Sequence, residues 1–164
     1  GVAIIKVGAA TESELKEKKL RIEDALNSTR AAVSEGIVVG GGSCLVKAYM
    51  ALKDQVKSDI VDVQRGIKVV FDALLTPIEQ IADNAGYNSE EIVARQKLAG
   101  DNIGFDAKRG EWVDMFKEGI IDPTKVCRNA LMNASSISAL FLTTEAGVAS
   151  IKEEKEVAPA PQMY

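Results

Sequence analysis

The chain has no histidine among its 164 residues, and this absence excludes several kinds of catalytic site. Without an imidazole there is no Ser-His-Asp or Cys-His nucleophile system and no histidine-ligated zinc. Any catalysis must therefore use carboxylates, lysines, backbone amides or a bound metal ion.

Cysteine is scarce as well, and long apolar runs are missing. Cys44 and Cys127 are far apart in sequence and form no C-x-x-C pair, which favours two reduced thiols in a cytosolic protein over a disulfide. No signal peptide precedes the first predicted helix, and no run of about 18 uncharged apolar residues could span a bilayer. The net charge of −4 gives no basic field for nucleic acid. We therefore expect a cytoplasmic protein that binds neither nucleic acid nor a membrane.

The composition that remains, 46% hydrophobic and 27% charged residues, is typical of a globular protein with a packed core. Residues 1–9, GVAIIKVGA, are rich in β-branched side chains and predict a strand that ends at Gly8. No partner strand is obvious, and the first residue is glycine rather than methionine. We expect the chain to be a piece of a longer protein that supplied the partner strand.

Helical periodicity dominates the rest of the chain. Thr11 and Glu14 form a capping box at the start of the first helix. Thr76 and Asp122 each precede a proline and are predicted to be N-caps. The last helix is apolar on more than one face and is expected to be central and packed on several sides. The predicted helices cover residues 11–35, 43–52, 60–75, 76–86, 88–99 and 122–144.

Two short β-structures and a tail complete the expected mainly α fold. Residues 102–113 predict a hairpin with Gly110 in its turn, in which Phe105 packs across the strands on Trp112. Residues 147–151 are expected to form a last strand. Residues 152–164 have the charge and proline content of a disordered tail.

The glycine run at residues 36–43, GIVVGGGS, separates the long charged helix from an apolar one. Consecutive glycines permit positive φ and leave no Cβ to block a close neighbour. Ser43 is placed to cap the next helix, and bare amides beside a helix N-terminus suit a phosphate. Taken alone, the run is better explained by a helix C-cap followed by tight packing.

Asp24 lies roughly 200° around the first helix from its apolar stripe, which includes Ile22 and Leu26. Two interpretations remain open. Asp24 is either a solvated carboxylate, with Arg21 as its candidate partner, or a carboxylate presented to a ligand across a gap.

Four segments in this order and spacing resemble the group I chaperonins, the GroEL family. They are GVAIIKVGAATE, KLRIEDALNSTRAAVSEGIVVGGG, NIGFDA and GIIDPTKVCRNAL. The resemblance covers residues 1 to about 151 and corresponds to the C-terminal third of the family's subunit. It implies a strand and helix of the intermediate domain at residues 1–35. It also implies the second half of the helical equatorial ATP-binding domain at residues 36–151.

The resemblance also implies the residues of a nucleotide site. Gly40 and Gly41 are expected beside the ribose and phosphates, and Asp122 at the ribose. Asp24 takes the place of the aspartate that orients or deprotonates the attacking water. The segment Asp106, Ala107 and Lys108 corresponds to the segment that brackets adenine. The family commonly has Asn-Ala-Ala there, so an amide contact to adenine would be lost.

What the resemblance implies for the whole protein is an ATP-hydrolysing chaperonin that encloses and refolds non-native proteins. Identical subunits would form two stacked seven-membered rings, and an apical domain outside this chain would bind the co-chaperonin and the unfolded protein. The Mg²⁺ ligands are expected outside this chain too, so the chain alone should be inactive. The alternative is a non-enzymatic helical interaction module derived from a chaperonin.

Overall fold

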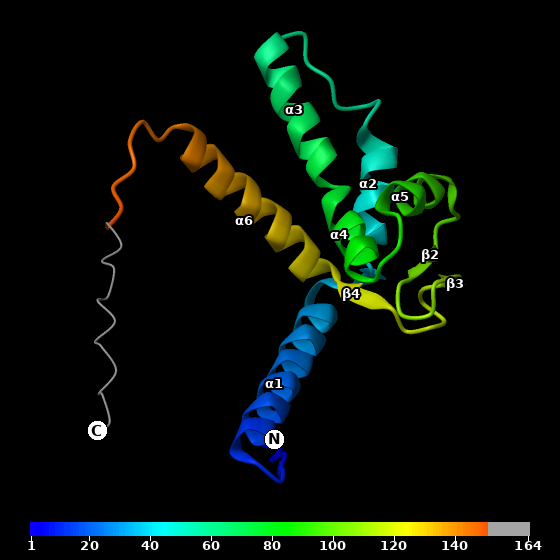
Figure 1. Ribbon diagram of the computed structural model, residues 1–164, viewed down its shortest axis with the longest axis vertical. Coiled ribbons are helices and arrows are strands. Elements are labelled where there is room, and N and C mark those ends of the chain that lie inside the picture. The colour runs from blue at the N-terminus through cyan, green and yellow to red at the C-terminus, as the bar shows by residue number, and fades with distance from the viewer. Residues whose placement is uncertain (151–164) are drawn as a thin grey trace, which may run out of the picture.

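A computed structural model describes residues 1–150 of the chain. The predicted mainly helical fold class is confirmed, with a few short antiparallel strands between the helices (Figure 1). In chain order the elements are α1 (Glu12–Glu35), β1 (Ile37–Val39), α2 (Ser43–Leu52), α3 (Val61–Ala73), α4 (Thr76–Asn84), α5 (Ser89–Leu98), β2 (Ile103–Asp106), β3 (Glu111–Asp114), β4 (Ile121–Pro123) and α6 (Thr124–Leu142).

Helix α1 begins where the sequence predicts, because the Thr11 hydroxyl accepts a hydrogen bond from the Glu14 N–H at 3.2 Å. It ends at Gly36, whose φ of 83° needs no Cβ. None of its residues is buried, and it projects from the rest of the fold (Figure 1). The predicted strand over residues 1–9 is wrong for the described chain: these residues find no pairing strand within residues 1–150.

Strands β1 and β4 pair antiparallel, with Val38 opposite Asp122. The sequence did not predict this pairing, which joins the end of α1 to the start of α6. The Thr124 N–H extends the contact by donating to the Gly36 carbonyl at 3.1 Å. The glycine run and the GIIDPTKV segment, far apart in sequence, therefore lie side by side.

The core lies among α2, α4, α5 and the β2–β3 hairpin, on the right in Figure 1. The predicted hairpin is confirmed, and Phe105 opposes Trp112 with their ring centroids 5.7 Å apart. Tyr87 adds an edge-to-face contact to Phe105 at 5.0 Å. The buried apolar cluster consists of Val46, Ile78, Ala82, Ile92, Val93 and Phe105.

The predicted N-caps of three helices are wrong, although the helices exist. Ser43 is the first helical residue of α2, its N-cap is Gly42, and its hydroxyl hydrogen-bonds to Gln96 instead. Thr76 is likewise inside α4, after an N-cap at Leu75. Asp122 is paired in β4, and the N-cap of α6 is Pro123. In each case the helix begins one residue away from the start that the serine or the following proline predicts.

Helix α6 is also not the central helix that was predicted. Within residues 1–150 it packs on α1 and β4 only near its start, and none of its residues is buried (Figure 1). Arg128 binds Glu35 of α1 through two hydrogen bonds of 3.0 and 2.7 Å. Residues 147–150 form no strand; residue 151 and the predicted disordered tail at 152–164 lie outside the described residues. No helix in the described part is long and apolar enough to cross a membrane.

Candidate nucleotide site

The glycine bend, residues 40–42, lies against β4 and α4. The Gly40 N–H donates to the Ile120 carbonyl at 2.9 Å, and a Cβ at Gly40 would meet that oxygen at 3.0 Å. Gly42 has a φ of 75°, and a Cβ there would lie 2.8 Å from the Ile78 nitrogen. The bend therefore needs glycine for close approach as well as for backbone conformation.

Two amides of the bend remain available. Within residues 1–150, the N–H groups of Gly41 and Gly42 donate no hydrogen bond, although Gly42 is buried. They precede the N-terminus of the ten-residue helix α2, where the helix dipole favours negative charge. The Gly40 N–H, in contrast, is already used. An anion could thus be bound at Gly41 and Gly42, with Gly40 holding the bend in place.

Asp122 lies next to this bend, in β4. Burial raises the pKa of its carboxyl group, and no hydrogen bond from residues 1–150 reaches the carboxylate. Asp122 also lines a cleft of about 160 Å³ between α1 and β4, together with Ser28, Thr29, Ala32, Ile37, Ile121 and Pro123. A half-buried carboxylate without a partner, on the wall of a cleft, is suited to accept hydrogen bonds from a hydroxyl-bearing ligand.

The two cysteines meet beside Asp122. Both thiols are free and partly buried, and they lie close enough to affect each other's pKa. Burial raises the pKa of Cys44 to about 12, and the neighbouring Cys127 and Asp122 add to the shift. Because the pKa of each thiol is raised, both groups are poor nucleophiles here.

Asp24 is exposed on α1, and its carboxylate forms no ion pair within the described residues. It lies one helical turn before Ser28, and hence on the same side of α1 as the Asp122 cleft. It does not line that cleft. Gly36 is twelve residues further on, roughly 18 Å along the helix axis, so Asp24 and the glycine bend are not in contact.

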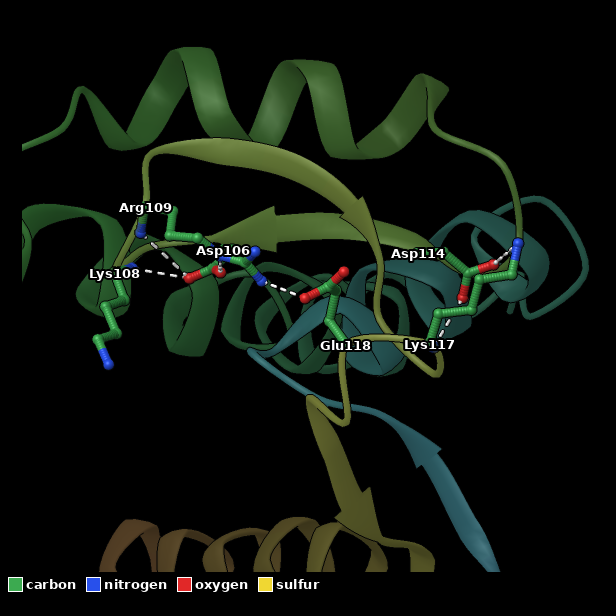
Figure 2. Close-up of polar contacts among 6 residues, drawn as sticks. All are labelled: Asp106, Lys108, Arg109, Asp114, Lys117 and Glu118. Carbon is green, nitrogen blue, oxygen red and sulfur yellow. Dashed lines mark hydrogen bonds and ion pairs between the residues drawn. The ribbon is translucent and has the colours of Figure 1, made fainter.

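The hairpin turn after β2 holds the segment Asp106, Ala107 and Lys108 (Figure 2). The Asp106 side chain is 8% exposed, and its Oδ1 accepts the Lys108 and Arg109 N–H groups at 2.9 and 3.3 Å. The Arg109 Nε donates to Asp106 Oδ2 at 2.6 Å, and this guanidinium lowers the pKa of Asp106. Ala107 packs against the core, whereas Lys108 is exposed and points away from the other side chains in the figure.

The structure thus brings Gly40, Gly41 and Asp122 together and leaves Asp24 on a separate arm. Sequence reasoning missed Arg109 and Glu118, which are joined by a hydrogen-bonded ion pair. The spacing Asp106-x-x-Arg109 across a glycine turn was the signal for the first contact. Nothing local in the sequence indicates the second.

Comparison with known proteins identifies the family. The sequence profile of the TCP-1/cpn60 chaperonin family matches residues 1–152. The chain belongs to this family.

Curated chaperonins cover nearly all of the chain. It is 58% identical over 164 residues to the chaperonin GroEL of Acholeplasma laidlawii (strain PG-8A), which is all of this chain and 31% of that protein. It is 61% identical over 156 residues to the chaperonin GroEL of Onion yellows phytoplasma (strain OY-M), or 95% of this chain and 29% of that protein. The chain therefore spans about a third of the length of these chaperonins.

A solved chaperonin structure supports the fold. A crystal structure of a group III chaperonin in the open state superposes with a TM-score of 0.73 at 27% identity, over 87% of this chain and 30% of that one. The described helices and short strands are thus those of a chaperonin segment.

Proposed function

We propose that this chain is the C-terminal third of an ATP-hydrolysing chaperonin subunit. The observation that carries the proposal is the family match over residues 1–152, together with relatives about three times as long. By this proposal residues 1–35 belong to the intermediate domain and residues 36–151 to the second half of the equatorial domain. The projecting α1, joined to the core through β1 and β4, agrees with such an arm.

The nucleotide would lie along the glycine bend. The free Gly41 and Gly42 amides would bind phosphate oxygens, and the Asp122 carboxylate would accept hydrogen bonds from the ribose. The turn at residues 106–108 would lie beside adenine. The residues present fit such a ligand, because its acceptors would meet unused donors and its hydroxyls an unpaired carboxylate.

Asp24 would act when α1 moves toward the bound nucleotide. Its carboxylate would orient or deprotonate the water that attacks the terminal phosphate. An exposed carboxylate without an ion pair in residues 1–150 is free for this role. Bound Mg²⁺ would neutralise charge on the phosphates. Since no group of three potential ligands lies together in the described residues, the ligands for this ion are expected elsewhere in the subunit.

The assembly would be a double seven-membered ring of identical subunits in the cytoplasm. A co-chaperonin and non-native proteins would be bound through an apical domain outside this chain. Exposed apolar side chains on α6 agree with a surface that further chain covers; they include Ile137, Leu140, Phe141 and Leu142. No observation favours the non-enzymatic interaction module.

The test compares two neighbouring acids in the full-length protein. Asp24→Ala should reduce kcat for ATP about 100-fold or more, and leave the Kd for ATP within about threefold. Glu23→Gln is the matched control, because Glu23 is exposed and, among residues 1–150, pairs only with Lys19 of its own helix. Equal losses in binding and turnover, or equal effects of the two substitutions, would contradict the role given to Asp24. The 164-residue chain alone should release no phosphate above background.

A further inference from the structure

One arginine joins two segments of the candidate site. The Arg109 guanidinium binds Asp106 at the hairpin turn through Nε, and Glu118 through its far nitrogen (Figure 2). Asp106 is almost fully buried, whereas Glu118 is partly exposed. Arg109 therefore connects the hairpin turn to the turn at residues 115–119.

The Asp106 end of this contact fixes the shape of the hairpin turn. Its carboxylate accepts two backbone N–H groups, and its own carbonyl accepts the Gly110 N–H at 2.8 Å. Such a carboxylate, bound on both oxygens, holds Ala107 and Lys108 in one arrangement.

The Glu118 end lies on the chain that leads into β4. Two residues after Glu118, the Ile120 N–H donates to the Met115 carbonyl at 2.8 Å. The Ile120 carbonyl accepts a hydrogen bond from the Gly40 N–H. Asp122 follows in β4. A restraint on Glu118 therefore acts on the segment that contacts the glycine bend through Ile120 and that carries Asp122.

We propose that Arg109 is a positioning residue for the base end of the nucleotide, an inference that rests on the proposed function. It keeps the 106–108 segment at a fixed distance from the glycine bend and from Asp122. Its single positive charge also offsets part of the negative charge of the Asp106 and Glu118 carboxylates, which would otherwise oppose a polyanionic ligand. The aspartate at this position is thus matched by an arginine three residues later.

The chain offers a matched control on the same turn. Lys117 pairs with Asp114 at 3.5 Å and is largely exposed, and it makes no contact with residues 106–110 in the described structure (Figure 2). Lys117→Gln removes one positive charge, as Arg109→Gln does. It removes one ion pair where Arg109→Gln removes two, and it leaves the contacts between the hairpin turn and Glu118 in place.

The experiment measures KM and kcat for ATP in the full-length protein. Arg109→Gln should raise KM about threefold to tenfold, the range expected for a charge-assisted pair, with kcat within about twofold. Lys117→Gln should leave both constants unchanged. Adding Asp106→Asn to Arg109→Gln should recover only part of the rise in KM. The amide oxygen still accepts the turn N–H groups without the charge, but the contact with Glu118 is not restored.

The outcomes are distinct. If the wild-type protein hydrolyses ATP and the two variants, Arg109→Gln and Lys117→Gln, have equal KM values, the positioning role of Arg109 is overturned. The proposed function is then unaffected. A fall in kcat as large as the rise in KM, without recovery by Asp106→Asn, shows a general loss of structure and overturns it too. A wild-type protein without ATP turnover contradicts the proposed function, and the inference fails with it.

Discussion

Replacing Gly42 with alanine should destabilise the fold by about 2–5 kcal/mol. A non-glycine residue at a φ of 75° costs about 1–2 kcal/mol. The added Cβ would lie 2.8 Å from the Ile78 nitrogen and 3.0 Å from its Cα, which are backbone atoms at the start of a packed helix. Overpacking of this kind costs about 1–3 kcal/mol more.

Two other glycines separate these contributions. Gly119 has a φ of 70° with nothing within 4 Å of an added Cβ, so Gly119→Ala should cost only the backbone contribution of about 1–2 kcal/mol. Gly66 lies inside α3 in open space at an ordinary φ, so Gly66→Ala should stabilise by about 0.5–1 kcal/mol. Urea unfolding followed by circular dichroism would measure all three. A Gly42→Ala protein as stable as Gly119→Ala would refute the argument that the bend is held against Ile78.

Two further predictions concern the groups beside the bend. Burial raises the pKa of Asp122 above its unfolded value of about 3.9. Between the unfolded and the folded pKa, the folded chain binds more protons than the unfolded chain. The free energy of unfolding therefore falls as the pH rises through this range. Asp122→Asn should therefore stabilise the ligand-free protein in urea at pH 7, and an equal effect at pH 3 would contradict this. Because burial raises the pKa of Cys44 and Cys127, both thiols should react with a disulfide reagent at pH 8 about tenfold or more slowly than in urea. Equal rates would show that the thiols are exposed.

Local patterns predicted much of this fold. The helix predicted over residues 88–99 is present as α5, and Asn88 Oδ1 caps it by accepting the Glu91 N–H at 3.2 Å. The Gly110 turn set the register that places Phe105 opposite Trp112. Both features depend on residues a few positions apart, where backbone conformation decides the structure.

Features that depend on contacts between residues far apart in the sequence could not be predicted from local patterns. Val38 and Asp122 pair across a long separation, and a three-residue strand carries no period of its own. Asp122 before a proline satisfies the rule for an N-cap, yet the pairing with β1 holds it in a strand. The apolar faces of α6 predicted burial, but the described residues do not supply the surface that would cover them.

The candidate site also has some features that the sequence predicts and others that only the structure shows. The glycine bend and Asp24 were selected from the sequence through the family resemblance, and the structure adds which amides of the bend remain free. The contact between Arg109 and Glu118 depends on how the hairpin folds against residues 115–119, which no local pattern encodes.

The most direct test of the account is a structure of the closed full-length subunit with a hydrolysis-resistant ATP analogue. We predict that the terminal phosphate of the ligand faces Asp24. The Asp24 carboxylate should lie about 3 Å from a water molecule that is aligned to attack this phosphate. We also predict phosphate oxygens on the Gly41 and Gly42 amides. An Asp24 carboxylate that stays remote from the terminal phosphate in the closed subunit would contradict the account.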